Sequence, residues 1–570
     1  MQKNSLLKLI VFCAITMVLA SCSKSNTQGR YIPKEAAAVI MMDGKSLTAK
    51  LPWDEIKQNP LFKEAYGDSS LPPAIKSLLE NPASAGIDPQ TDLLFFTIKD
   101  SLGGYFAFEG TVKDAAAFKA FNQKVTENGS ESEKGDIQFI SKAPVCVGFT
   151  KDKFIYIINA PQMAQMDDLS RRMMRDSIDM PTISARDISL TCQSVFDLSE
   201  SNSLAKNEHF TSLTKESGDM HFWINFEEIG KTTGSTNALA MLNMERFNKG
   251  NVTTGTVNFE NGKMAIKIKS YASDDLMKIF KKYSGGKINE DMVKRLPGKD
   301  MMAVMAVNFK PEGLMELVKL TGFDGLVNIG LKSLGFTIED FVKANKGDVV
   351  VGFSDLTIKT DSASLMPENG EPNFPAKQTP DFNFVFSASI GDKDAFNKLV
   401  DAGKKMGGAA LDENGNSKIS YNSNGTFFAL GNSKENVDKF LASPSNSFDF
   451  LDKMSGEPFG GYLNIQSLLK SFGSLAQKDS AAKVAYDANL SMWDNIVWKG
   501  GNYSDGGITQ NIEVNLVDKS TNSLKQFNNY AAKMALFYKE NKKKQWDEMK
   551  AYDEEMAVPI DSAVSPMMNK

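Results

Sequence analysis

The sequence has 570 residues, enough for several domains at roughly 100–200 residues each. Apolar residues make up 42% and charged residues 24%, a composition typical of folded globular proteins and not of disordered or polytopic membrane chains. The formal charge is −5, from 65 basic and 70 acidic residues, which removes any overall attraction to nucleic acid. With only two histidines and four cysteines, most enzyme classes lack candidate residues.

The chain begins with the parts of an export signal. Lys3 and Lys8 supply positive charge, and the apolar run at 9–20 that follows is too short to span a bilayer as a mature helix. The run ends in Leu19-Ala20-Ser21-Cys22, which resembles a bacterial lipobox. We therefore expect residues 1–21 to be a lipoprotein signal peptide and Cys22 to be the lipidated residue. An ordinary signal peptide with a chance cysteine is the alternative.

The expected lipid on Cys22 defines a location. Acyl chains hold a protein on a membrane because each buried methylene contributes about 0.8 kcal/mol, so no transmembrane helix is needed. Ser23 stands where inner-membrane lipoproteins of enteric bacteria carry aspartate, and no acidic residue precedes Glu35. These features favour a lipid anchor in the outer membrane and a periplasm-facing protein, with residues 22–30 as the lipidated tether.

Two cysteines, Cys146 and Cys192, remain for a disulfide once Cys13 leaves with the signal and Cys22 is acylated. Both lie in apolar segments that read as strands, where a free thiol behaves as a small hydrophobic group. A bridge in an oxidising envelope is the alternative. The absence of any Cys-x-x-Cys pair argues against thioredoxin-like redox chemistry and zinc ribbons.

In chain order, the mature sequence predicts one series of elements twice. The first series has a strand, helical segments, a strand, a strand running into a helix, and a hairpin, at 36–41, 53–66 with 75–79, 92–96, 105–121 and 151–158. The second series repeats that order at 300–305, 314–334, 348–353, 382–399 and 423–430. Asp114 and Asp392 stand where a side chain would cap the helix after the strand.

A further strand, hairpin and helix close each series. They lie at 220–226, 257–268 and 274–283 in the first half, and at 461–465, 508–516 and 523–538 in the second. Together these patterns predict an α+β fold built by tandem duplication of a mainly antiparallel sheet-plus-helix unit. The expected repeats are residues 31–285 and 296–540, and residues 541–570 form a charged C-terminal helix and tail. The segment 359–381, rich in Pro, Asn, Ser and Asp, is expected to be an inserted surface loop.

Catalytic and metal-binding motifs occur in the sequence only in incomplete form. Gly44-Lys45-Ser46 and Gly230-Lys231-Thr232 lack the earlier glycine of a phosphate-binding loop, and no Gly-x-Ser-x-Gly elbow occurs. His221 is expected to be a structural histidine on a strand, and His209 a surface-loop residue. The oxygen-bearing run around Asp412 lacks the glycine and glutamate of a calcium loop. We therefore predict no catalytic residues, no metal and no cofactor.

Two segments have the character of binding surfaces. A methionine stripe could line an adaptable apolar groove, although packing in the core is the more common role of such residues; it consists of Met163, Met166, Met173, Met174 and Met180. The C-terminal helix continues beyond its apolar stripe into a lysine-rich segment that contains Trp546 and Met549. That second part could project as an amphipathic arm toward lipid or a partner.

The lipobox, the opening Tyr31-Ile32-Pro33-Lys34-Glu35-Ala36-Ala37-Ala38-Val39, the segment Gly44-Lys45-Ser46-Leu47 and the repeated strand-helix unit give the chain a family resemblance. It resembles the lipoproteins of the Bacteroides group classed as domain of unknown function 4836. That resemblance implies an envelope lipoprotein and supplies no catalytic residues.

From these observations we expect a non-enzymatic cell-envelope lipoprotein that serves as a binding or scaffold protein for an envelope partner or an amphiphilic ligand. One alternative is a periplasmic carrier of lipids or other amphiphiles, for which a continuous apolar cavity between sheet and helices is the required sign. Another is an envelope hydrolase whose carboxylates the sequence does not single out.

Overall fold

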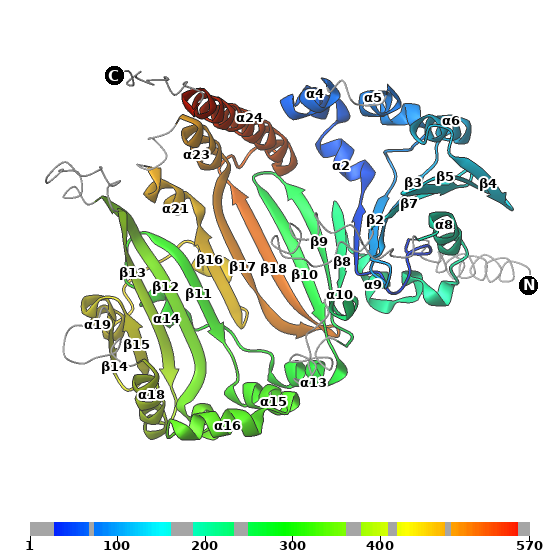
Figure 1. The fold of residues 1–570 in the computed structure, drawn as a ribbon. Helices are drawn as coiled ribbons and strands as arrows, with labels where there is room; N and C mark the ends of the chain where they lie inside the picture. The colour runs from blue at the N-terminus through cyan, green and yellow to red at the C-terminus, as the bar shows by residue number, and fades with distance from the viewer. Residues whose placement is uncertain are drawn as a thin grey trace, which may run out of the picture.

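The computed structural model describes residues 28–67, 73–160, 186–232, 249–360, 378–407, 419–473 and 480–556. In these residues, eighteen strands form one sheet in which every neighbouring pair is antiparallel. The sheet curves into a long arch with helices on its two faces and along its rims (Figure 1). The predicted α+β class is confirmed.

The first half supplies ten strands and most of the helices at one end of the arch (Figure 1). Its strands are β1 Ala38–Met42, β2 Leu93–Ile98, β3 Tyr105–Thr111, β4 Ser130–Lys134, β5 Ile137–Lys142, β6 Val145–Phe149, β7 Lys153–Asn159, β8 Met220–Asn225, β9 Val252–Glu260 and β10 Lys263–Tyr271. Its helices are α2 Gly44–Lys50, α3 Trp53–Gln58, α4 Pro60–Gly67, α5 Pro73–Glu80, α6 Ala115–Val125, α8 Ile188–Phe196, α9 Glu208–Leu213, α10 Phe226–Thr232 and α13 Asp274–Tyr283, with short 3-10 turns at Pro82–Ala85, Glu200–Asn202 and Leu204–Lys206.

The second half supplies the other eight strands. They are β11 Met301–Asn308, β12 Asn345–Thr360, β13 Gln378–Ile390, β14 Ser420–Ser423, β15 Phe427–Gly431, β16 Phe459–Asn464, β17 Trp493–Ser504 and β18 Gly507–Leu516. The helices are α14 Glu290–Lys294, α15 Pro311–Thr321, α16 Asp324–Ser333, α17 Ile338–Ala344, α18 Lys393–Gly407, α19 Lys434–Ala442, α20 Leu451–Met454, α21 Ile465–Ser471, α23 Ser480–Met492 and α24 Ser523–Met556.

Both halves pair their strands in the same order. In the first half β1 lies between β2 and β8, and the sheet continues through β3 and β7 on one side and β9 and β10 on the other. In the second half β11 lies between β12 and β16, and the sheet continues through β13 and β15, and through β17 and β18. This shared order is what the predicted tandem duplication requires; a common origin of the halves stays a prediction.

The two halves meet strand to strand, because β10 pairs antiparallel with β18. Their register runs from Lys263 opposite Asn515 to Ser270 opposite Ile508. Lys263 also forms an ion pair with Glu513 across this junction, with 2.8 Å between Nζ and Oε1. Antiparallel pairing of equivalent strands is the arrangement that a local two-fold axis generates, and it makes one continuous sheet from two units.

One face of the sheet, which we call the covered face, forms the hydrophobic cores. In the first half α8 and α9 lie on it, and Trp223, Phe96 and Phe210 are buried there. In the second half α14, α19 and α20 take that place. Successive side chains of a strand point to opposite faces, so the alternate residues lie on the other face of the sheet.

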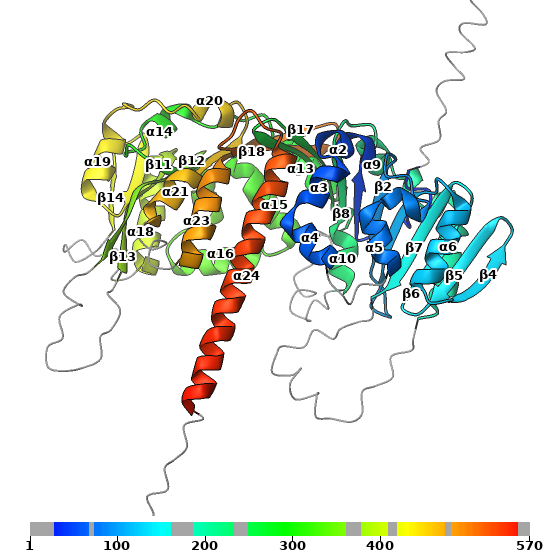
Figure 2. The ribbon, with the colours of Figure 1, turned by 90° about the horizontal axis from the view of Figure 1, so that it is seen from above.

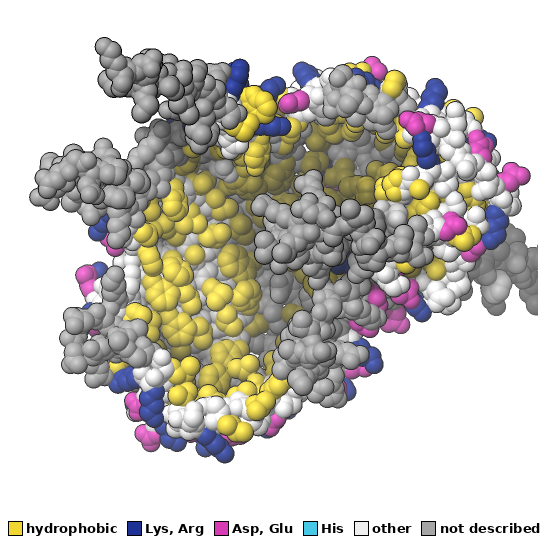
Figure 3. Space-filling view, viewed as in Figure 1, with side chains coloured by type: hydrophobic (Ala, Val, Ile, Leu, Met, Phe, Trp, Pro, Cys, Tyr) yellow, Lys and Arg dark blue, Asp and Glu magenta, His cyan; other side chains and the backbone are white. Residues whose placement is uncertain are grey.

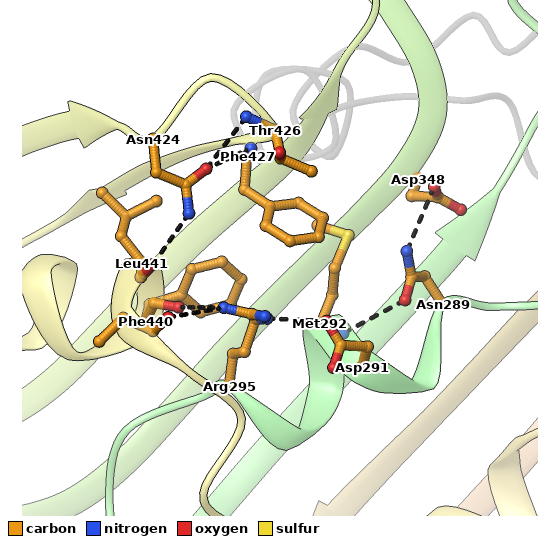
Figure 4. Close-up of polar contacts among 11 residues, drawn as sticks. Asn289, Asp291, Met292, Arg295, Asp348, Asn424, Thr426, Phe427, Phe440 and Leu441 are labelled. Atoms are coloured by element: carbon orange, nitrogen blue, oxygen red, sulfur yellow. Dashed lines mark hydrogen bonds and ion pairs between the residues drawn. The ribbon is translucent and has the colours of Figure 1, made fainter.

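The segment expected to separate the repeats belongs to the second core. Met292, Val293 and Leu296 are buried in the second cluster, so residues 288–296 are part of the second unit and not a linker. Figure 4 shows how α14 is held: Arg295 donates through Nε to Asp291 at 2.8 Å and through its terminal nitrogen to the Phe440 carbonyl at 3.4 Å. The boundary between the units therefore lies before α14.

The helices that follow β3 and β13, the strands of the repeated strand-helix unit, begin where the sequence predicts. The carboxylate of Asp114 accepts from the Ala117 amide at 3.0 Å at the start of α6. The carboxylate of Asp392 accepts from the Ala395 amide at 2.9 Å at the start of α18. Both acidic residues satisfy amides that would otherwise lack a partner in the first turn, so the two predicted caps are confirmed.

Three local predictions are wrong. Cys192 lies in α8 and not in a strand, because its neighbours bury one helical face against the sheet. His209 lies in α9, where its ring stacks on Tyr271 with centroids 3.7 Å apart, and not in a surface loop. The ends of the expected loop 359–381 continue the β12–β13 hairpin, with Lys359 paired to Thr379.

Candidate ligand-binding face

The face of the sheet opposite the covered face, which we call the open face, carries a row of apolar side chains across the first half. Ile40 pairs with Phe95 on one side and Phe222 on the other, and Phe95 pairs with Phe108. The rings of Phe95 and Phe108 stack with centroids 4.5 Å apart. Yet Ile40 is 42% exposed and Phe95 40% exposed. These side chains therefore pack against their neighbours within the sheet, but no other element of the described chain covers them.

This row reaches the junction through Gly255 and Ile268, which pairs with Gln510. A neighbouring row on the same face, two residues along the strands, crosses the junction into the second half. Ile266 pairs with Ile512, and the cross-strand neighbours that follow are almost all apolar: Trp498, Gly461, Met305, Val351, Phe386, Leu430 and Tyr421. Met305 is 42% exposed at the middle of this half. None of these positions carries a charge, although a solvated sheet face is normally polar.

A glycine opposite an aromatic ring occurs in this floor in both halves. A Cβ at Gly255 would clash with the ring of Phe222, and a Cβ at Gly461 would clash with the indole of Trp498. The rings therefore lie flat across the neighbouring strand. Such cross-strand packing over glycine keeps the floor smooth and leaves ring faces turned to the open side.

Helices stand along the rims of the open face and do not close it. In Figure 1, α15 and α16 lie along the lower rim and α21, α23 and α24 along the upper rim. Seen from above, α16, α23 and α24 project from the open side, whereas α14, α19 and α20 lie on the covered side (Figure 2). The space-filling view shows the result, a broad hollow whose floor is largely hydrophobic over the second half (Figure 3).

An apolar cavity of about 610 Å³ lies in the open face where the halves meet. The residues that line it come from β10, β18, α13 and α15, and include Leu276, Phe280, Leu317 and Ile508. Gln510 is one of its few polar groups. Cavities of roughly 300–1,000 Å³ with mostly apolar walls and few polar groups are typical of small-molecule sites.

A second apolar cavity, of about 340 Å³, lies between α17, α18 and the outer strands of the second half. Phe341, Leu399, Val400 and Phe428 are among the residues that line it. At its edge the ammonium of Lys404 lies 5.6 Å from the ring centroid of Tyr421. This cavity joins an apolar interior to a cationic group.

Polar side chains gather elsewhere, in a cavity of about 420 Å³ beside α2. There Asp219, 2% exposed, accepts from Lys50 at 2.6 Å and from the Phe259 amide at 2.6 Å. Ser46 Oγ donates to the same carboxylate at 2.5 Å. Because these donors satisfy its carboxylate, Asp219 holds α2 to the sheet.

Each of the two histidines lies against a neighbouring group of the described chain. His221 lies on β8 and its Nε2 is 2.8 Å from the Glu216 carbonyl oxygen, the structural role that the sequence predicts. The ring of His209 is held against Tyr271, and burial and the nearby Lys269 ammonium lower its pKa. In the described part of the chain, no three His, Cys, Asp or Glu residues are grouped so as to hold a metal ion.

The two remaining cysteines are free thiols buried side by side. Cys146 on β6 and Cys192 on α8 are both 0% exposed. A hydrogen bond to Cys146 and burial raise the pKa of the Cys192 thiol. The structure therefore shows small hydrophobic groups in the core, one of the two expectations from the sequence.

Several predicted features lie outside the described residues. These are the lipidation site Cys22, the methionine stripe from Met163 to Met180, and the oxygen-bearing run around Asp412. The C-terminal helix is described to Met556 and projects beyond the body as one unbroken helix, α24 (Figure 2). On it Trp546 is 63% exposed and Met549 51% exposed. None of the helices described is long and apolar enough to cross a membrane.

The open face itself was not predicted. A signal is present in the strands, which read Leu-Leu-Phe-Phe-Thr-Ile at β2 and Met-Met-Ala-Val-Met-Ala-Val at β11 without polar alternation. A strand with apolar residues on both sides either is buried on both faces or has one apolar face that is exposed and can bind a ligand or partner. Only the placement of the helices distinguishes these two cases.

Comparison with known proteins places the chain in a family and adds no activity. The solved structures similar to it include crystal forms I and IV of TP0453, each 10% identical in sequence. The match with form I spans 42% of this chain and 79% of the TP0453 chain, with a TM-score of 0.20. The match with form IV spans 45% and 87%, with a TM-score of 0.22. No curated protein matches. The profile described as "Domain of unknown function (DUF4836)" matches residues 29–367. The chain therefore belongs to the domain of unknown function 4836 family.

Proposed function

We propose that this protein binds an amphiphile with long acyl chains on its open face and acts in the cell envelope as a non-enzymatic lipid-binding carrier. The observation that carries the proposal is the uncharged open face, with neighbouring cross-strand rows of mostly apolar residues in the two halves, one apolar cavity at the junction and another under α18. The carrier is an alternative from the sequence, and a continuous apolar cavity between sheet and helices is its expected sign; the support found instead is an open apolar floor with two separate apolar cavities.

The size of the exposed apolar surface argues for an occupant. Soluble monomers rarely expose contiguous apolar patches larger than a few hundred Å² without a binding role. Here Ile40, Phe95, Phe106, Met305 and Phe353 are each 39–53% exposed on the same face. Covering such side chains is favourable by roughly 25 cal/mol per Å² of apolar area removed from water.

The chemistry of the lining favours acyl chains over other ligands. The floor offers no charge and few hydrogen-bonding groups, so it cannot select a sugar or a peptide backbone by polar contacts. Polar groups stand at the cavity margins instead: Gln510 and Ser270 at the junction cavity, and Lys404 at the cavity under α18. This separation of apolar floor from polar margin fits an amphiphile whose acyl tail lies on the floor and whose anionic head group lies beside Lys404.

The location that we propose follows from the sequence. A signal peptide at 1–21 and a lipid on Cys22 would anchor the protein in the outer membrane on the periplasmic side. Gln28, the first residue of the described chain, lines the polar cavity beside α2 and not the open face.

The test is a binding titration with a defined probe. The mature chain carrying Cys22→Ser is exported with an ordinary signal, stripped of lipid, and titrated with cis-parinaric acid, whose fluorescence rises in an apolar site. We expect saturable binding that Val400→Trp weakens, because an indole at Val400 fills the cavity under α18. The matched control is Leu190→Gln, a residue of α8 on the covered side that is 62% exposed.

Saturable binding that both variants leave unchanged would refute the assignment to this cavity. Absence of saturable binding by the unmodified chain, to this probe and to a phospholipid carrying a fluorescent acyl chain, would refute the lipid-binding function. In that case a protein partner on the open face becomes the better account, and chemical crosslinking from Met305→Cys would identify it.

A further inference from the structure

Among the described residues, the aliphatic and methionine side chains with the largest exposed fractions are found together at one rim of the open face. They are Met406 at 74%, Ile329 at 69% and Leu326 at 65%. Leu326 and Ile329 lie one turn apart on α16, and Met406 lies at the end of α18. We call these three residues the rim patch.

A hydrogen bond places the two helices side by side. Lys405 Nζ, next to Met406, donates to the carbonyl oxygen of Leu334, the C-cap of α16, at 3.1 Å. α17 lies between them in the chain and packs against both. The C-terminal ends of α16 and α18 are therefore neighbours at the lower rim of the arch in Figure 1, and Ile329 and Leu326 lie about one and two turns back from that end of α16.

The outward side of α16 has the wrong composition for a helix that faces water. Lys332, in the last turn, is the one charged residue among its exposed positions; the others are Gly325, Leu326, Ile329, Gly330 and Ser333. An outer helix normally places charged residues there and apolar residues inward. Leu326 and Ile329 are instead on the outside, although the same helix has partly buried apolar residues on its inner side.

Positive charge borders the patch at the end where the two helices meet. Lys332 is exposed in the last turn of α16, and Lys404 and Lys405 lie in the last turn of α18. The acidic residues of these helices are farther back: Asp324 begins α16, and Asp401 lies one turn before Lys405. Apolar side chains flanked by lysines fit a surface with an apolar interior and anionic heads.

The same helix end leads directly to a cavity. Leu399, Val400, Gly403 and Lys404 of α18 line the apolar cavity of about 340 Å³. Met406 follows on that helix toward solvent. An acyl chain leaving a lipid layer beside Met406 would thus meet apolar walls within one turn of α18.

We propose that the rim patch docks the protein on an anionic lipid surface, so that acyl chains pass between that surface and the open face through the cavity under α18. This inference rests on the proposed lipid binding but concerns a separate surface. Leu326 and Ile329 do not line either apolar cavity. Docking and ligand binding can therefore be measured independently.

The experiment is vesicle flotation with the mature chain carrying Cys22→Ser, so that no covalent lipid contributes. Vesicles of phosphatidylethanolamine with phosphatidylglycerol are compared with vesicles of phosphatidylcholine. We expect flotation with the anionic vesicles, and the double variant Leu326→Gln/Ile329→Gln should need roughly tenfold more lipid for half-maximal binding. Lys332→Gln should raise the requirement about fivefold with the anionic vesicles only.

Controls separate docking from folding and from the ligand site. Leu190→Gln alters an equally exposed leucine on the covered side and should float like the unmodified chain. The double variant should keep its thermal midpoint and bind cis-parinaric acid in solution as before. If it binds the probe normally and also floats normally, the rim patch is not the docking surface. If flotation fails for the unmodified chain while the probe binds, docking is refuted and ligand binding stands.

Discussion

The substitution Met305→Gln tests the open face with little change of shape. Met305 lies on β11 with Gly461 and Val351 as its cross-strand neighbours, and 42% of the residue is exposed. Glutamine has the same chain length, so the floor keeps its volume and the fold should persist. The exposed part is what a bound acyl chain would cover.

The expected loss has two parts. Full burial of a methionine side chain is favourable by about 1.5–3 kcal/mol, so covering the exposed two-fifths contributes about 1 kcal/mol. Covering an amide that finds no partner costs about 1–3 kcal/mol more. The sum, about 2–4 kcal/mol, corresponds to a Kd for cis-parinaric acid raised by a factor of roughly 30 to 1,000.

The assay is a fluorescence titration, with Met305→Leu as the conservative counterpart and a thermal melt to confirm folding. Met305→Leu should keep the Kd within about tenfold of the unmodified chain, because apolar swaps of similar volume usually cost less than about 1.5 kcal/mol. A Met305→Gln variant that is folded and binds as tightly as the unmodified chain would show that no acyl chain lies over β11. The reasoning from the open face would then be refuted.

Three further predictions address the floor, the histidine and the anchor. Gly461→Ala should displace the Trp498 indole, seen as a shift in tryptophan emission, with weaker probe binding; unchanged emission would contradict the packing. The lowered pKa of His209 means that its stabilising contribution is complete above pH of about 6.5, the unfolded value, and is lost as pH falls through the folded pKa. His209→Phe keeps a ring against Tyr271 and should flatten that part of the melting-temperature profile; an unchanged slope would contradict it. Cys22→Ser should abolish palmitate labelling and release the protein from the membrane fraction, and retention with label would contradict the lipid anchor.

Much of the architecture was predictable because the signals are local. Apolar and β-branched runs predict the strands β1, β3, β12 and β13. Capping aspartates predict the start of the helices that follow β3 and β13. The repeated order of these elements also predicts the repeated strand pairing. Such features depend on a few neighbouring residues and on nothing distant.

What was missed depends on contacts far apart in the chain. The pairing of β10 with β18 joins segments some 250 residues apart, and nothing in either strand specifies the other. His209 and Cys192 were misplaced because short helices are set by packing: Phe210, next to His209, and Val195, one turn after Cys192, are buried against the sheet. Tertiary contacts of this kind override local propensity.

The open face could not be derived from pattern alone for a related reason. Strands with apolar residues on both sides indicate two apolar faces, but helices that cover one of them look the same in sequence as helices that stand along a rim. α16 illustrates the limit, since Leu326 and Val327 are equally apolar while the first is exposed and the second partly buried. The candidate site emerges only when the helices are placed.

The most direct test of the account is native mass spectrometry of the mature chain carrying Cys22→Ser, exported in its own host and purified from the envelope without detergent. The account predicts added mass that dissociates on activation and that organic extraction identifies as a lipid with long acyl chains. Met305→Gln should carry less of it. A bare chain, with no lipid in the extract of the same preparation, would contradict the central claim that the open face holds an amphiphile.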